Sequence, residues 1–337
     1  MTDYTSPVSD QELGVRSDAA SSPVREHDRS YGPGRRAGAR SPAKTESIAD
    51  SLIYWLCSAL IAVIQSLPLR FVARLGRAAG ALAFYLDARH RRTVLNNLAS
   101  VFGREKPAAE IQAIAHENFK RIGENNFCAI KTAAMSFEEL RPHLEFTGLE
   151  NFPQSRPEGK MRNAVVALGH FGNFELHARV VEALPHDQVA TTFRAFKQPS
   201  LNRLMQSLRA KSGCVFFERR ADGAALRARL NRGGLILGLL ADQSSAGMRA
   251  PFLGIECNVG LAPAILALRY QAVLSTAICY RTGLAKWRVE CGKPIPTQVD
   301  GHPRSSQELM LDVNRELEAA VRRDPANWFW VHRRWKK

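Results

Sequence analysis

The sequence predicts an α/β protein with a largely parallel sheet flanked by helices. From residue 146 onward, short apolar runs alternate with helix-like segments, an alternation typical of parallel sheets covered on both faces. The 337 residues are 45% apolar, enough for a substantial core. Strands are expected at 164–168, 188–193, 214–217, 235–241 and 273–280, and helices at 108–135, 199–212, 221–232 and 261–270.

The N-terminal part divides into two segments ahead of the main domain. Residues 1–47 are rich in Ser, Pro, Gly and charge and lack an apolar face, so we expect a disordered tail. Residues 48–92 are expected to form a membrane anchor followed by a basic amphipathic helix, and residues 93–337 the main domain.

The expected anchor is the apolar run 52–64, which approaches the length of a membrane span only when it is extended to residue 69. On length alone, a buried helix is an equal alternative. The next segment places Arg70, Arg74 and Arg77 at helical spacing on one face, with apolar residues on another. This pattern favours a membrane surface with anionic lipid, although a solvated face of a globular domain would look similar.

The formal net charge of +15 indicates an anionic partner. Residues 1–50 contain seven Lys/Arg and eight Asp/Glu, so the remainder of the chain has a charge of about +16. The six cysteines show no Cys-x-x-Cys pairing, which suits a reducing compartment.

A histidine and a glutamate separated by four residues, His170 and Glu175, follow the apolar run 164–168. Asn173 can cap a helix over 173–184. The histidine is therefore expected at the C-terminal tip of a strand, where α/β sheets bind ligands, and the glutamate in the first helical turn. A neutral histidine can take a proton from a hydroxyl when a carboxylate holds its other ring nitrogen. We expect His170 as general base, oriented by Glu175.

Two other interpretations of this motif remain open. The two residues could be an ordinary hydrogen-bonding pair without a catalytic role. They could also bind zinc together with His177, but no cysteine or further histidine clusters with them, so we expect no metal.

Five segments of the chain resemble one known family in order. They are Arg91-Arg-Thr-Val-Leu-Asn-Asn-Leu98, the His-x4-Glu run at 170–175, Gly213-Cys-Val-Phe-Phe-Glu-Arg219, the Asp-Gln segment 240–243 followed by Pro251-Phe-Leu-Gly254, and the Trp- and Arg-rich ending 325–335. Over residues 50–337 the sequence is similar to the bacterial lipid A biosynthesis (lauroyl/myristoyl) acyltransferases, within the lysophospholipid acyltransferase superfamily.

The resemblance implies a glycerolipid acyltransferase-like fold and transfer of a fatty acyl chain from a thioester to a hydroxyl of a lipid A precursor. It implies acyl carrier protein as donor, a phosphorylated glycolipid as acceptor, an anionic membrane as support, and no cofactor. The basic flank of the expected anchor favours attachment to the inner membrane with the catalytic domain on the cytoplasmic side.

Further site residues follow from position and resemblance. Arg209 is the first candidate donor to the oxyanion of the tetrahedral intermediate, and the amides at residues 172–173 are the second. Arg219 and Arg194 are candidates for phosphate binding. Asp242 follows the expected strand 235–241 and should lie at the same sheet edge, positioning the acceptor, pairing with Arg209 or serving as a turn residue.

Two alternative functions compete with this hypothesis. A related enzyme could acylate another glycolipid or a lysophospholipid with the same histidine. A membrane-tethered nucleic-acid-binding protein would also be basic, but the sequence contains no recognised nucleic-acid module, so we expect no nucleic-acid partner. Trp328, Trp330 and Trp335 are expected to pack rather than to act in catalysis.

Overall fold

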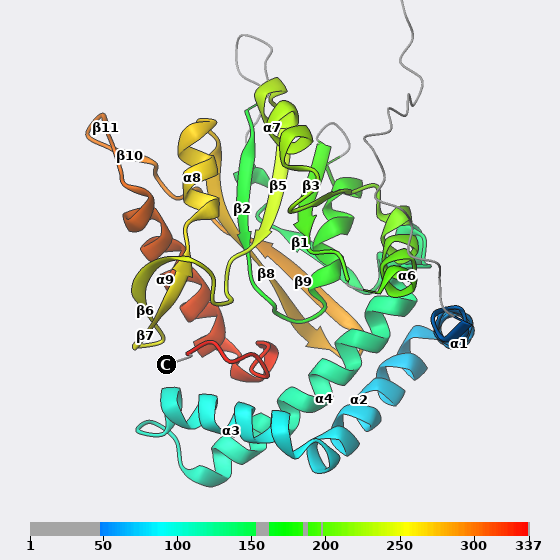
Figure 1. The fold of residues 1–337 in the computed structure, drawn as a ribbon. Helices are drawn as coiled ribbons and strands as arrows, with labels where there is room; N and C mark the ends of the chain where they lie inside the picture. The colour runs from blue at the N-terminus through cyan, green and yellow to red at the C-terminus, as the bar shows by residue number, and fades with distance from the viewer. Residues whose placement is uncertain (1–47, 153–161, 185–187, 197, 336–337) are drawn as a thin grey trace, which may run out of the picture. The chain divides into compact units, whose positions relative to one another are not determined.

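The computed structural model describes residues 48–152, 162–184, 188–196 and 198–335. The predicted tail 1–47 lies outside them, and the proposed division at residue 93 stays a prediction. The described residues form a seven-stranded sheet in the order β1-β9-β8-β2-β5-β3-β4 (Figure 1). The strands are β1 (Leu144–Thr147), β2 (Ala164–Leu168), β3 (Gln188–Phe193), β4 (Val215–Glu218), β5 (Leu235–Leu240), β8 (Val273–Gly283) and β9 (Lys286–Cys291).

The predicted largely parallel sheet is confirmed. Strands β8, β2, β5, β3 and β4 run parallel to one another, whereas β9 is antiparallel to β8 and parallel to β1. Strands β1 and β9 and the hairpin of β6 (Gly247–Phe252) with β7 (Ile255–Gly260) were not predicted from the sequence. Nor was the short pair β10 (Gln298–Val299) and β11 (His302–Pro303).

Helices cover both faces of the sheet. Alternate residues of β2 enter two separate core clusters: Val165 and Ala167 pack in one, Val166 and Leu168 in the other. Apart from α1, α2 and η2, whose bounds are given below, the α-helices are α3 (Ala88–Phe102), α4 (Ala108–Thr132), α5 (Phe137–Leu140), α6 (Pro199–Arg209), α7 (Gly223–Arg232), α8 (Ala262–Arg269) and α9 (Ser306–Arg323). The 3-10 turns are η1 (Leu149–Asn151), η3 (Ala210–Ser212) and η4 (Pro325–Asn327).

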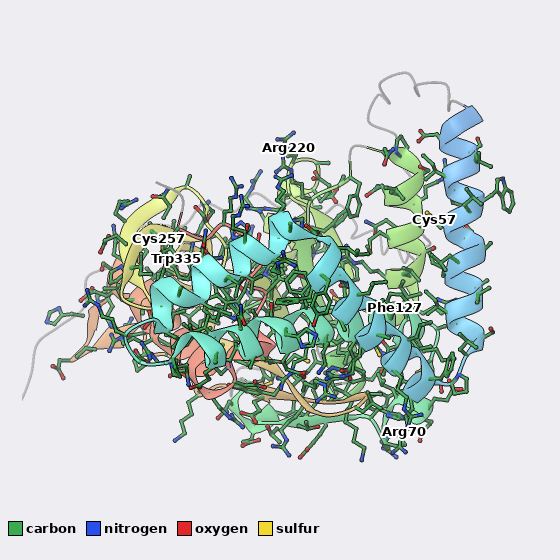
Figure 2. All side chains as sticks on the ribbon, turned by 90° about the horizontal axis from the view of Figure 1, so that it is seen from below. Cys57, Arg70, Phe127, Arg220, Cys257 and Trp335 are labelled. Atoms are coloured by element: carbon green, nitrogen blue, oxygen red, sulfur yellow. The ribbon has the colours of Figure 1, made fainter. Side chains whose placement is uncertain are left out.

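The two N-terminal helices are α1 (Ile48–Ser66) and α2 (Leu69–Leu86). Their outward faces are apolar, with exposed Leu52, Trp55, Leu56, Leu60 and Val63 on α1 and exposed Phe71, Leu75, Leu82, Tyr85 and Leu86 on α2. α1 lies beside α6 at the edge of the molecule (Figure 2). Within the described residues, no helix combines the length and apolar character needed to cross a membrane.

The inward face of α2 packs closely on α4. A Cβ at Gly76 would lie 2.6 Å from the carbonyl oxygen of Gly123, and one at Gly80 would lie 2.2 Å from that of Phe119. The close approach therefore depends on glycine.

This packing corrects the prediction that three arginines of α2 share one free basic face. Arg77 forms ion pairs with Glu117 at 2.9 Å and with the fully buried Glu124 at 3.2 Å, both on α4. Arg70 and Arg74 are exposed, as predicted.

Candidate active site

A histidine and an aspartate meet where two neighbouring parallel strands end. Leu168, the last residue of β2, is paired with Leu240, the last residue of β5. His170 and Asp242 each follow two residues later, and the Nδ1 atom of His170 lies 2.7 Å from an Asp242 carboxylate oxygen. The backbone N–H of His170 donates to the other carboxylate oxygen, also at 2.7 Å. Asp242 therefore fixes both the ring and the backbone of His170.

Burial and charge act in opposite directions on this pair. Burial alone would lower the pKa of His170, but the adjacent Asp242 carboxylate raises it above its ordinary value. Burial would raise the pKa of Asp242, yet His170 and the donated hydrogen bonds hold it below its ordinary value. The aspartate is thus ionised, and it stabilises the protonated imidazole that a general base forms.

The C-terminal segment supports the buried aspartate from the far side. The indole N–H of Trp328 donates to Asp242 at 2.8 Å, and Trp328 is 2% exposed. An isolated β-bridge pairs Trp328 with Phe171, and the backbone N–H of Gly172 donates to the Asn327 carbonyl at 3.0 Å. The histidine loop and the chain terminus are therefore joined beside the aspartate.

Glu175 has a different partner from the predicted one. Arg209 of α6 donates to its carboxylate from Nη2 at 2.6 Å and from Nε at 3.2 Å. The predicted orienting contact of Glu175 with His170 is replaced by that of Asp242, and the alternative pairing of Asp242 with Arg209 is wrong. Glu175 lies in the first turn of the 3-10 helix η2 (Phe174–Glu182), and its negative charge also raises the pKa of His170.

The Glu175–Arg209 pair lies on the shared wall of two cavities. An apolar cavity of about 80 Å³ runs along the sheet beneath η2, lined by side chains such as Val166, Ala190, Gly238 and Ala277. A second cavity of about 330 Å³ lies among α4, η2 and α6. Glu175, Arg209, Phe174, Ala178 and Phe216 line both. The Arg209 guanidinium lies 5.0 Å from the centre of the Phe216 ring.

Asn173 and His177 are buried beside these cavities. The predicted cap is wrong, because the Asn173 side chain makes no capping hydrogen bond and the helix that follows is 3-10 rather than α. Neither amide atom of Asn173 has a hydrogen-bond partner among the described residues, and the side chain lines the second cavity. Burial lowers the pKa of His177 to about 4, which keeps that ring neutral.

The two other arginines predicted in the site make no described hydrogen bond or ion pair with His170. Arg194 and Arg219 directly follow β3 and β4 and are exposed. The backbone N–H of Arg219 donates to the carbonyl of Phe193. The described residues contain no group of three or more His, Cys, Asp or Glu side chains that could hold a metal ion.

The sequence analysis did not assign two residues that contact the pair. Trp328 was expected only to pack, although a buried indole N–H requires an acceptor and so indicates a polar neighbour. Gln243 belongs to the Asp-Gln segment, and its amide nitrogen lies 3.3 Å from Nε2 and 3.4 Å from Nδ1 of His170. Phe174 and Phe329 flank the imidazole at ring distances of 4.9 and 5.9 Å.

The comparison with known families identifies the class of the protein. The model of the family described as bacterial lipid A biosynthesis acyltransferase matches residues 43–337. The chain belongs to this acyltransferase family. The resemblance deduced from the five sequence segments is thereby confirmed, and the protein is an acyltransferase of lipid A biosynthesis.

Two relatives of this acyltransferase match it over most of their length. The lipid A biosynthesis palmitoleoyltransferase of Escherichia coli (strain K12) is 24% identical over 303 residues, covering 84% of this chain and 92% of that protein. The lipid A biosynthesis acyltransferase of Shigella flexneri matches with the same identity and coverage.

Proposed function

We propose that this acyltransferase moves a fatty acyl chain from an acyl carrier protein thioester to a hydroxyl of a lipid A precursor. The observation that supports this most strongly is the pairing of His170 with the buried Asp242, in a loop whose Phe174 and Glu175 line an apolar cavity. Such a pair can activate a hydroxyl, and the apolar lining of the cavity suits part of a hydrocarbon chain.

The proposed reaction is a direct transfer with His170 as the shuttle for one proton. The Nε2 atom takes the proton of the acceptor hydroxyl while that oxygen attacks the thioester carbonyl. When the tetrahedral intermediate collapses, the carbon–sulfur bond breaks and the imidazolium returns the proton to the thiolate leaving group. Asp242 holds the Nδ1–H throughout and stabilises the charged imidazolium, so no acyl-enzyme is required.

Charge also develops on the carbonyl oxygen, and Arg209 is the proposed donor to it. Its Nε and Nη2 atoms are engaged by Glu175, which orients the guanidinium and leaves Nη1 without a described hydrogen-bond partner. The Gly172 amide already donates to Asn327, so it is a poorer candidate than the unpartnered Asn173 side chain. Donors fixed before the reaction stabilise the intermediate without reorganisation.

We propose that the outward faces of α1 and α2 rest in the cytoplasmic leaflet of the inner membrane. The exposed Trp55 and Leu60 on α1 and Phe71 on α2 supply apolar area, and the exposed Arg70 and Arg74 supply positive charge for anionic lipid. This is monotopic attachment, in which helices lie on the membrane rather than cross it.

The membrane proposal is tested by flotation of the full chain with vesicles. Trp55→Ser with Leu60→Ser removes two side chains, each expected to contribute roughly 1.5–3 kcal/mol when buried. Membrane binding should fall at least tenfold, whereas Ile265→Ser, which changes an exposed apolar residue of α8, should have little effect. Equal losses in the two variants would contradict the proposal.

The proposed reaction is tested with purified substrates. A lipid A precursor should gain one acyl chain from an acyl carrier protein thioester, and mass spectrometry of the product identifies the chain and its position. Faster transfer from acyl coenzyme A would overturn the donor assignment. Acylation of a lysophospholipid in preference to the precursor would overturn the acceptor assignment.

A further inference from the structure

A broad open groove of about 1180 Å³ separates α3 from the β6–β7 hairpin. One face of α3 forms the first wall, with Arg89, Arg92 and Asn96. Arg249 of the hairpin and Arg333 and Trp335 of the C-terminal segment form the other side. Figure 2 shows Trp335 where α3 passes the hairpin. The groove shares no lining residue with the two cavities beside Glu175, and neither His170 nor Asp242 lines it.

The arginines of this groove are not used by the fold. Arg89, Arg92, Arg249 and Arg333 are exposed, and none forms an ion pair with another described residue. Arg91, by contrast, points away and donates to the carbonyls of Phe84 and Tyr85 at the end of α2. Glu256 is the one carboxylate among the described lining residues, so the groove keeps a strong positive charge.

The position of the groove favours a lipid headgroup over a protein. Leu82, Tyr85 and Leu86 form the exposed apolar end of α2, and Arg89 follows within one helical turn. Apolar side chains that enter a bilayer place the next basic residues at the depth of the headgroups. A ligand in the groove could therefore keep its hydrocarbon chains in the membrane.

We propose that the groove between α3 and the β6–β7 hairpin binds the phosphate-bearing headgroup of a lipid. Guanidinium groups bind phosphate oxygens in a fork, and arginines on two walls can hold one headgroup from both sides. The inference rests on the proposed function, because the acceptor proposed above is a phosphorylated glycolipid. It assigns phosphate recognition to this groove in place of Arg194 and Arg219.

The test measures binding of the full chain to glycolipid in neutral detergent micelles. The probe is a diphosphorylated glucosamine disaccharide lipid, compared with the same lipid without phosphates. The groove variant Arg92→Ala/Arg249→Ala removes one arginine from each wall. The matched control Arg227→Ala/Arg232→Ala removes the same charge from exposed positions on α7, at the opposite end of the sheet (Figure 1).

The parent should bind the phosphorylated lipid at least about tenfold more tightly than the dephosphorylated one, since hydrogen bonds between charged groups are stronger than those between neutral groups. The groove variant should lose most of this preference and the control should keep it. A preference that survives in the groove variant, or is absent in the parent, overturns the proposal.

Two further arms identify the source of the phosphate and the class of partner. Inorganic phosphate at millimolar concentration should compete weakly; competition as strong as that of the lipid would overturn a headgroup site. Loss of binding to acyl carrier protein in the groove variant, with lipid binding intact, would assign the groove to a protein partner and also overturn it. Binding of the lipid requires no turnover. Unimpaired binding of the phosphorylated lipid by His170→Ala protein would therefore support this inference even if the parent transfers no acyl chain.

Discussion

The His-x4-Glu segment contributes to two charge pairs that differ in their surroundings. The side chains of His170 and its partner Asp242 are 15% and 1% exposed, whereas those of Glu175 and its partner Arg209 are 28% and 18% exposed, so the main difference is the buried aspartate. The first pair is held by two strands and the C-terminal segment. The second lies on the wall of two cavities, where a substrate can reach it. This difference is consistent with the roles proposed above, proton transfer by His170 with Asp242 and stabilisation of the oxyanion by Arg209 oriented by Glu175.

Burial decides how each pair responds to the loss of one partner. Removing one member of a buried pair leaves a charge without a partner or solvent, which is costly. A partly exposed pair is screened by water, so its loss mainly frees the remaining side chain to move. Substitutions in the two pairs should therefore differ in both size and pH dependence.

The largest effect is expected from Asp242→Asn. Loss of the orienting carboxylate should lower kcat/KM by roughly 10²–10⁴, because the imidazole loses both the hydrogen-bond acceptor that fixes its tautomer and the negative charge that stabilises its protonated form. Asp242 raises the pKa of His170, so the variant histidine should stay neutral to lower pH. The acid limb of the pH profile should shift to lower pH, measured as kcat/KM against pH; an unmoved acid limb in a folded variant contradicts the pairing.

A smaller loss is expected from Arg209→Ala. Removing a donor to the oxyanion typically lowers the rate by about 10²–10³. The acid limb should shift far less than in Asp242→Asn, because Arg209 contacts Glu175 and not the imidazole. Arg209→Lys should recover only part of the rate, since an ammonium group cannot form the same fork. Full recovery by lysine would argue for a simple charge effect.

Trp328→Phe tests the far side of the buried pair. The ring remains but the hydrogen bond to Asp242 is lost, which should lower kcat by about tenfold for a bond to a charged group. KM should change less than kcat, because Trp328 lines neither cavity beside Glu175 and only the small space of about 20 Å³ beside His170. An unchanged kcat with a lower melting temperature would assign a purely structural role to the indole.

The smallest effect on total activity is expected from a substitution that narrows the apolar cavity, Gly238→Val. A Cβ at Gly238 would lie 2.9 Å from Leu168 Cδ1, so Gly238→Val should narrow the cavity against the sheet. Preference should move toward shorter acyl chains by about tenfold, the usual selectivity of one or two methylene groups in an apolar pocket. Competition between thioesters of different length measures this, and an unchanged preference would place the acyl chain elsewhere.

Local sequence patterns were sufficient to predict the strands that build the site. Strands β2 and β5 are short apolar runs, and both His170 and Asp242 directly follow such runs. Their positions at one sheet edge were therefore predictable.

Contacts between distant segments were not predictable in the same way. Whether Asp242 or Glu175 reaches His170 depends on β2 lying next to β5, which strand order decides and single-sequence periodicity does not encode. The pairing of Arg77 with α4 likewise depends on the close approach of Gly76 and Gly123, which lie far apart in sequence. Strand β9 was predictable but overlooked, because its charged residues alternate with the buried Trp287, Val289 and Cys291, which is the period of a half-buried strand.

The central claim is that His170 acts as one unit with Asp242 and not with Glu175, and a double-mutant cycle on kcat/KM tests it most directly. His170→Ala/Asp242→Asn should be little worse than His170→Ala alone, because an orienting group has nothing to orient once the base is gone. His170→Ala/Glu175→Gln should show close to the product of the two single losses. The assignment would be contradicted if the single losses multiplied in His170→Ala/Asp242→Asn while His170→Ala/Glu175→Gln was little worse than His170→Ala alone.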